Sequence, residues 1–150
     1  ILTGRWTANE EMREAGLTSL CWLMQHQRGE GGCFRPIGSN GFWRKGEQPA
    51  AFDQQPVDAA AAVGACIEAY NATADQSWQA EAIRAFDWFL AANDLGELLY
   101  DPATGGCRDG LHPNRANQNQ GAESTLSFLL ALAEMKALDN ASAAFSERPT

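Results

Sequence analysis

Apolar or small side chains recur every three or four residues in four separate segments, and this spacing constrains the chain to a helical fold. The segments run from 7 to 27, from 56 to 70, from 75 to 90 and from 121 to 138. We therefore predict an all-α fold with about four main helices, arranged as antiparallel α/α hairpins.

Local start signals accompany three of these segments. Thr7 and Glu10 form an S/T-x-x-E capping box at the first segment. Pro56 suits the first turn of the second helix, where a missing N–H is harmless. Asp75 or Ser77 can cap the third.

The distribution of polar residues predicts which helices are interior. The first and third segments carry polar residues off their apolar stripes, as Glu81 and Arg84 do. The second is rich in small residues, and the fourth is apolar nearly all round, which is typical of a buried helix. We expect the second and fourth helices to be interior and a tail at 139–150 to be weakly ordered.

Two connections, 28–53 and 94–120, are unusually long, whereas the connection at 71–76 is short. Loops beyond ~12–15 residues in a compact domain are usually functional or disordered. Each long loop leads from an expected outer helix to an inner one, so an up-down array places both loops at one end. We expect a binding surface there.

Composition favours one domain spanning 1–150, with its core at 7–138. The 11 Lys and Arg residues against 19 Asp and Glu give a net charge of −8. This balance argues against nucleic acid or an anionic membrane as partner and favours a neutral or polyhydroxyl ligand. No apolar run approaches the ~20 residues that span a bilayer, so we expect a soluble, cytoplasmic chain. The start at Ile1 suggests a processed or truncated product.

The four cysteines give little support to a metal site. They are far apart, form no C-x-x-C motif, and are joined by only two histidines, His26 and His112. We expect no metal and no other cofactor. Two disulfides remain open, although unpaired buried thiols are favoured.

The two halves of the chain repeat one another. Gly31-Gly32-Cys33 corresponds to Gly105-Gly106-Cys107, and Gln55-Pro56-Val57-Asp58 corresponds to Gln120-Gly121-Ala122-Glu123. The repeating unit is an outer helix, a G-G-C loop and an inner helix. Stacked units of this kind close either a solenoid or a ring.

Three stretches, 52–56, 101–111 and 117–125, resemble a helical region attached to bacterial glycosyltransferases. The resemblance covers most of 7–138, and that region is similar to the six-hairpin glycosidase-like superfamily. Its α/α toroids bind sugars in a central cleft and often use carboxylates there. The resemblance implies a partial toroid, four helices of a full twelve, acting on or binding a glycan. A homodimer or an attached glycosyltransferase domain would be the partner.

Candidate catalytic residues are the carboxylates Glu123, Asp109 and Asp58. Glycosidic chemistry uses one protonated and one ionised carboxyl group. Asp58 and Glu123 hold equivalent places near inner-helix starts, where the alternative is neutralisation of the helix dipole, the favoured role for Asp58. Asp109 belongs to a polar cluster with Arg108 and His112, although Asp is also common in turns.

Candidate ligand-binding residues are amides, basic groups and an aromatic ring near the long loops. Trp43 and Arg35 could supply a stacking surface and donors, although Trp43 could equally fill the core. Asp53 could instead be an N-cap. The full set is Asp53, Gln54, Gln55, Arg35, Trp43, Arg108, Asn117, Asn119 and Gln120. The alternative functions are a non-catalytic accessory domain of a glycosyltransferase and a fragment that pairs with itself.

Overall fold

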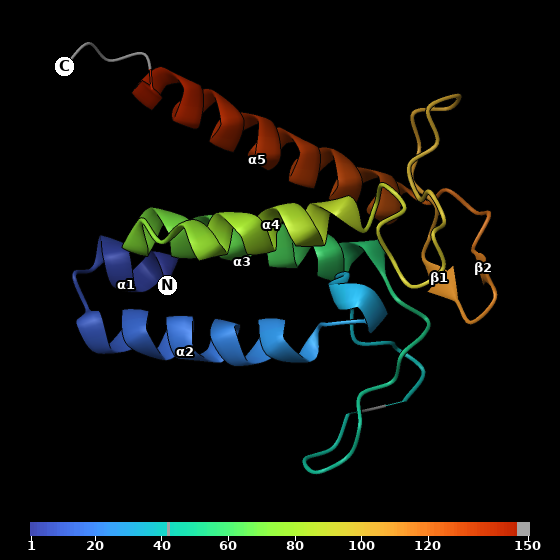
Figure 1. Ribbon diagram of the computed structural model, residues 1–150, viewed down its shortest axis with the longest axis horizontal. Helices are drawn as coiled ribbons and strands as arrows, with labels where there is room; N and C mark the ends of the chain where they lie inside the picture. The colour runs from blue at the N-terminus through green and yellow to red at the C-terminus, as the bar shows by residue number, and fades with distance from the viewer. Residues whose placement is uncertain (42, 147–150) are drawn as a thin grey trace.

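The computed structural model describes residues 1–41 and 43–146, with side chains as far as residue 140. Helices dominate this part of the chain, and the all-α prediction is confirmed at that level (Figure 1). The elements are α1 (Leu2–Trp6), α2 (Glu10–His26), a 3-10 turn (Glu30–Gly32), α3 (Pro56–Thr73), α4 (Gln76–Asp87), β1 (Leu111–His112), β2 (Arg115–Ala116) and α5 (Ala122–Ser146). The two short antiparallel strands were not predicted.

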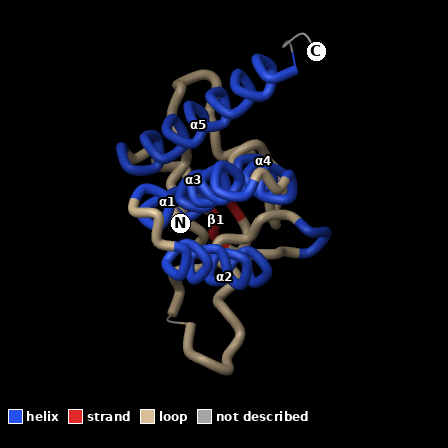
Figure 2. Tube along the Cα trace, turned by 90° about the vertical axis from the view of Figure 1, so that its left-hand side faces the viewer, coloured by secondary structure: helices blue, strands red, loops and turns tan. Residues whose placement is uncertain are grey.

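The helices form three tiers, with α5 outermost on one side, α3 and α4 in the middle, and α2 on the other side (Figure 2). α3 packs extensively on α4 and α5 and more lightly on α2. The interior position of α3 is therefore confirmed. The interior position expected for α5 is wrong: in the described part of the chain, α3, α4 and Tyr100 of the second loop cover one face of this helix, and its other face is exposed.

The core lies between α3, α4 and α5. Val63 and Cys66 of α3 are fully buried, as are Trp88 and Phe89 just after α4. The ring of Phe89 meets that of Phe128 on α5, with centroids 5.4 Å apart. Alanines on α3 allow close approach of the neighbouring helices, as the small-residue pattern indicated.

The start of α2 differs from the predicted capping box. Asn9 is the N-cap, and its side chain accepts a hydrogen bond from the backbone N–H of Met12 at 2.9 Å. Thr7 instead ends the short α1, which the sequence analysis did not predict, and its hydroxyl donates to the carbonyl of Thr3. The cap therefore lies two residues later than the Thr7–Glu10 pattern indicated.

The polar face of α4 is not a solvent face. Arg84 donates to the backbone carbonyls of Met24, Gln27 and Cys33, and it also pairs with Glu81. These contacts attach α4 to the C-terminal end of α2 and to the first long loop. The side chain of Arg84 is only 14% exposed, so the outer character predicted for this face is wrong.

α5 leaves much of its apolar surface exposed. Leu126, Leu129 and Leu130 are 58%, 46% and 65% exposed, whereas Phe128 and Ala131 on the other face are buried. The helix also continues past the expected end at Leu138 to Ser146. Residues 147–150 of the expected weakly ordered tail lie outside the described residues.

Both long loops lie at one end of the helices, as predicted (Figure 1). Gln54 and Leu111, one from each loop, exchange two backbone hydrogen bonds of 3.1 Å. This bridge fixes the loops against each other. In the described part of the chain, no helix is long and apolar enough to cross a membrane.

All four cysteines are free thiols. Cys66 and Cys107 are buried as expected, whereas Cys33 is half-buried and Cys21 is exposed. Burial raises the pKa of Cys66 to about 12. Burial and the charge of Asp109 raise the pKa of Cys107 to about 12 as well, so neither thiol is a nucleophile near neutral pH.

Candidate functional site

A buried polar network anchors the two long loops. Asp94 accepts hydrogen bonds from Arg35, whose Nε lies 2.8 Å from Oδ2, and from the Nε2 of Gln54 at 2.7 Å. The fully buried Gln54 side chain also donates to the carbonyl of Ala51 and accepts from the indole N–H of Trp88 at 2.7 Å. One amide thus joins the first loop, the second loop and the end of α4.

Two glycines allow the loop backbones to approach closely. A Cβ atom on Gly110, whose φ is +141°, would overlap the carbonyl oxygen of Gln54. A Cβ atom on Gly38 would overlap the carbonyl oxygen of Phe52. One contact is with Gln54 itself and the other is with Phe52, two residues before it, so the close approach of the loops here depends on glycine at both positions.

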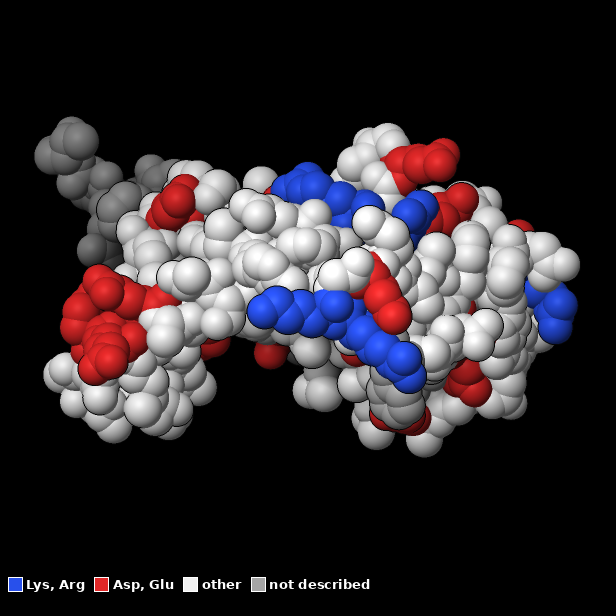
Figure 3. All heavy atoms as spheres, turned by 90° about the horizontal axis from the view of Figure 1, so that it is seen from below, with Lys and Arg blue, Asp and Glu red and all other residues white. Residues whose placement is uncertain are grey.

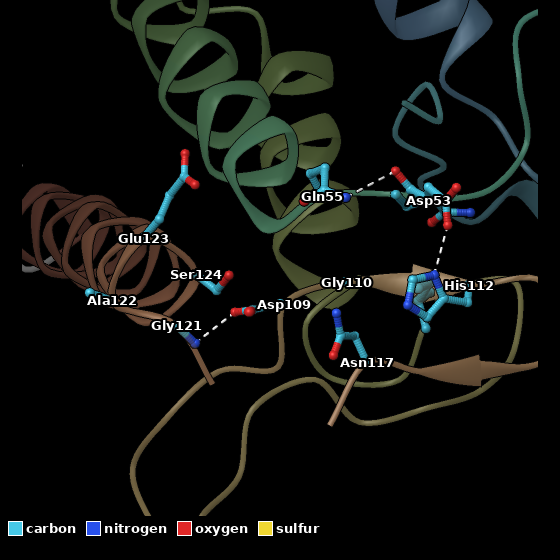
Figure 4. A pocket seen from close by; sticks show the side chains of 12 residues that line it. Asp53, Gln55, Asp109, Gly110, His112, Asn117, Gly121, Ala122, Glu123 and Ser124 are labelled. Atoms are coloured by element: carbon cyan, nitrogen blue, oxygen red, sulfur yellow. Dashed lines mark hydrogen bonds and ion pairs between the residues drawn. The ribbon is translucent and has the colours of Figure 1, made fainter. Parts of the chain in front are cut away.

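A polar pocket of about 340 Å³ lies where the loops meet the starts of α3 and α5. We call it the loop-end pocket. It takes in the segment after the first loop, the turn before β1, and the first turn of α5 (Figure 4). Its lining residues are Asp53, Gln54, Gln55, Asp109, Gly110, Leu111, His112, Asn117, Gly121, Ala122, Glu123 and Ser124.

Asp109 connects the pocket to the start of α5. Its carboxylate accepts from the backbone N–H of Gly121 at 2.7 Å and from the side-chain amide of Asn119. Partial burial opposes ionisation, but hydrogen bonds from Ser124, Asn119 and Gly121 outweigh it and lower the pKa of Asp109. Asp109 is therefore an ionised acceptor, suited to a base or ligand-binding role and unsuited to a general acid.

Asp53 and His112 form a pair on the other side of the pocket. Nδ1 of His112 lies 2.7 Å from Oδ1 of Asp53, and both side chains are about one-third exposed, at 33% and 32%. Asp53 has φ +59°, a left-handed conformation that Asp tolerates better than most residues. The expected alternative of an N-cap does not apply, because Gln55 holds that position on α3.

The remaining polar groups lie between these two pairs. In Figure 4, Asn117 lies between Asp109 and His112, and the carboxylate of Glu123 points away from Asp109. Gln55 donates from its amide to the carbonyl of Asp53 at 3.2 Å. The exposed Glu123 lies in the first turn of α5 and lines the pocket.

The structure brings six of the predicted site residues to this pocket: Asp53, Gln54, Gln55, Asp109, Asn117 and Glu123. The side chain of Gln54 is fully occupied by its internal hydrogen bonds, so it contributes the wall rather than a ligand contact. Asn119 does not line the pocket, but its side-chain amide donates a hydrogen bond to Asp109, which does.

Asp58 and Gln120 do not line the pocket. Asp58 lies in the first turn of α3, and burial raises the pKa of its carboxyl group. The amide of Gln120 instead donates to the carboxylate of Asp101 at 2.9 Å and accepts from the hydroxyl of Thr104 at 2.7 Å.

Three larger predicted residues also lie elsewhere. Arg35 is paired with Asp94. The guanidinium of Arg108 donates to the carbonyl of Leu98 and does not join Asp109 and His112 in one cluster. Trp43 stacks on Trp22 at a centroid distance of 5.1 Å, with rings only 10° from parallel.

The Trp22–Trp43 stack is partly open to solvent. Trp22 is 51% exposed, although it lies within α2. The ring of His26 lies beside it at 4.4 Å, and Nδ1 of His26 contacts the carbonyl of Trp22 at 2.7 Å. His26 thus satisfies a carbonyl near the end of α2, in agreement with a role at the helix terminus.

Sequence reasoning missed Ser124 and the pairing of His112 with Asp53. Ser124 follows Glu123 in the recurring segment at the start of α5, and only its predicted helical position gave a signal. His112 was grouped with Arg108 and Asp109 because they are close in sequence. The actual partner is 59 residues away, so local spacing could not identify it.

The pocket residues favour hydrogen bonding over metal binding. Among residues 1–41 and 43–140, no group of three or more His, Cys, Asp and Glu side chains is placed to hold a metal ion. No Lys or Arg in this part of the chain lines the pocket. The face viewed in Figure 3 carries its basic side chains in separate groups, with acidic ones gathered near the start of α2, where Glu10 and Glu11 lie.

Comparison with known proteins adds no relative. No protein-family model matches the chain, and no curated protein matches it.

Proposed function

We propose that the chain is a carbohydrate-active α/α-hairpin domain that binds or acts on a glycan in the loop-end pocket. The observation that carries this proposal is the composition of that pocket. It combines carboxylates, amides, an imidazole and a hydroxyl, and no Lys or Arg of the described residues lines it. Sugar hydroxyls both donate and accept hydrogen bonds, so such a mixture of fixed partners suits them.

The size and charge of the pocket support a neutral polyhydroxyl ligand. Its volume of about 340 Å³ lies at the lower end of the usual range for small-molecule sites, ~300–1,000 Å³. The net charge of −8 and the ionised Asp109 disfavour anionic ligands. A six-hairpin-like partial toroid, attached to a glycosyltransferase, is the architecture in which we place the domain.

If the domain is an enzyme, its carboxylates would have different roles. Asp109 would act as the ionised carboxylate, and Glu123 would be the second of the two carboxyl groups that glycoside chemistry uses. Asp58 would support the start of α3 rather than contact ligand, because it does not line the pocket.

The test is a glycan-array and product screen on the purified chain, alongside Glu123→Gln and Asp109→Asn. Asp139→Asn is the matched control, because Asp139 is an exposed carboxylate on the same helix. We expect both pocket variants to lose glycan binding or turnover and the control to keep it. Unchanged binding and turnover in both pocket variants would refute the proposal.

The second candidate function is a non-catalytic accessory or oligomerisation domain, including pairing of this chain with itself. The exposed leucines of α5 favour it, because a helix of this kind normally covers its apolar face. This function predicts glycan binding or oligomer formation with no product. A chain that is strictly monomeric by light scattering would count against self-pairing.

A further inference from the structure

The pair formed by Asp53 and His112 determines which ring nitrogen carries the proton. An ionised carboxylate can only accept a hydrogen bond, so Nδ1 of His112 must be the donor across the 2.7 Å contact. In the neutral imidazole, the other nitrogen, Nε2, then holds a lone pair and is an acceptor. The pair therefore selects one tautomer.

Nε2 of His112 is available to a ligand. Within the described residues, the ring of His112 makes one hydrogen bond, from Nδ1 to Asp53, and Nε2 has no hydrogen-bond partner. The ring lines the loop-end pocket. The carboxylate of Asp109, which also lines the pocket, already accepts hydrogen bonds from Gly121 and Asn119.

The backbone holds Asp53 in place for this contact. Its carbonyl oxygen accepts from the N–H and the hydroxyl of Ser39, each at 3.1 Å, and from the amide of Gln55 at 3.2 Å. These three bonds maintain the left-handed conformation at φ +59°. A sparsely populated conformation that its surroundings maintain at a pocket is a recognised sign of a functional position.

We propose that His112 is a ligand-binding residue of the loop-end pocket, whose Nε2 accepts a hydrogen bond from a hydroxyl of an uncharged sugar. Asp53 is the positioning residue that fixes the tautomer. The inference rests on the proposed function of the pocket and adds its ligand selectivity. Nε2 accepts a hydrogen bond from a sugar hydroxyl, and the ionised Asp109 in the same pocket disfavours an anionic sugar.

The first experiment needs no ligand. The chain contains two histidines, so a protein labelled with ¹⁵N-histidine gives two imidazole patterns. We expect neutral His112 to carry its proton on Nδ1, and Asp53→Asn to increase the Nε2–H form. Asn tolerates the left-handed conformation of Asp53, so this variant tests whether the carboxylate fixes the tautomer without straining the backbone. A free protein with His112 in the Nε2–H form would refute the inference.

The second experiment adds methyl glycosides of glucose, mannose, galactose and N-acetylglucosamine. The backbone amides of Gly110 and Gly121 report binding in the pocket, and the Nε2 resonance of His112 reports the proposed contact. His26 is an internal control, because its Nδ1 is also held by an acceptor, the carbonyl of Trp22. We expect glycosides that shift Gly110 and Gly121 to shift His112 and leave His26 unchanged.

The matched variants are His112→Asn and His26→Asn. Asn at 112 keeps a donor toward Asp53 and removes Nε2, so the dissociation constant should rise about three- to ten-fold, the size of one neutral hydrogen bond. Asn at 26 should leave it unchanged. We do not expect His112→Asn to retain the affinity of the wild type, although it keeps the donor toward Asp53, because it lacks the nitrogen that faces the ligand.

Each outcome separates the inference from the proposed function. Shifts of Gly110 and Gly121 without a change at His112 would refute the inference and leave the function standing. Shifts at His26 alone would place the sugar on the Trp22–Trp43 stack. This result would refute both the inference about His112 and the proposed function of the loop-end pocket. If no glycoside shifts either glycine, the proposed function fails, and the inference fails with it.

Discussion

Replacing Gln54 by Ala should destabilise the fold strongly, although this residue lines the loop-end pocket. The variant leaves the buried indole N–H of Trp88 without its acceptor, and an unsatisfied buried group costs about 1–3 kcal/mol. It also removes a bond to the carboxylate of Asp94, and bonds to charged groups contribute about 1.5–3 kcal/mol. The expected loss in the free energy of unfolding is therefore about 2.5–6 kcal/mol, before any cost for the cavity.

Urea unfolding followed by circular dichroism measures this loss. With an m-value of about 2 kcal/mol per molar urea, the midpoint should fall by about 1.2–3 M. Gln55→Ala is the matched control, because the neighbouring amide is half-buried and donates one hydrogen bond. Its expected cost is about 0.5–1.5 kcal/mol.

A double-mutant cycle separates the network from simple loss of volume. Trp88→Phe removes the indole N–H, so Gln54→Ala should cost less in that background than in the wild-type chain. Equal costs in both backgrounds, or a loss no larger than that of Gln55→Ala, would refute the role of Gln54 as the junction between the loops.

Three further predictions concern the same end of the molecule. Asp109→Ala removes the acceptor at the start of α5 and should cost about 1–2 kcal/mol in urea unfolding at neutral pH. Since the pKa of Asp109 is lowered in the folded protein, this stabilisation is present above the ordinary value of 3.8 and is lost as pH falls through the lowered pKa. If Asp109→Ala still destabilises the protein in stronger acid, the ionised carboxylate is not the source of the stabilisation. For Asp58, whose pKa is raised, the sign reverses: the stability that its protonated carboxyl group contributes is lost as pH rises from 3.8 through the raised pKa. Asp58→Asn should therefore gain stability relative to the wild type over that interval. A constant difference across the pH series would contradict this prediction. Gly110→Ala should lower the urea midpoint more than Gly105→Ala, because only at Gly110 would the new Cβ overlap backbone, and equal effects would show that the loop crossing tolerates a side chain.

The positions of the helices could be predicted because their signals are local. Pro56 marks the first residue of α3, and Asp75 caps α4 by accepting from the N–H of Ser77 at 2.9 Å. Each signal requires only neighbours within one turn, and the sequence displays those directly. The common end of the two loops could also be predicted, since it follows from helix order alone.

The exact start of α2 could not be predicted from local chemistry. Both Thr7 and Asn9 are good cap residues. The choice depends on α1, whose Gly4 lies against the backbone of Asn9 and Arg13 so closely that a Cβ atom would not fit. This packing is tertiary, and the capping box gives no information about it.

The membership of the pocket could be predicted only in part, because it depends on how two loops align. The bridge between Gln54 and Leu111 sets the register that brings Asp53 to His112. A shift of one residue would turn His112 to the other side of its strand. Sequence spacing identified polar residues on both loops, but it could not supply this register.

Arg35 illustrates the same limit from the opposite direction. A basic residue in a long loop is a reasonable ligand donor until its partner is known. The partner, Asp94, is 59 residues away and is buried, with its side chain 6% exposed. An uncompensated Asp94 would be costly, so the ion pair takes precedence over ligand binding.

The apolar pattern of α5 shows how the number of neighbours limits a prediction of burial. A helix that is apolar nearly all round can be buried only if other elements surround it, and here α3 and α4 supply one side. Leu126, Leu129 and Leu130 therefore face outward for lack of a further layer. In the proposed partial toroid, or in a self-paired assembly, another helix would cover these side chains. Catalytic assays do not report on that contact, so light scattering, rather than glycan turnover, tests the self-pairing form of the accessory function.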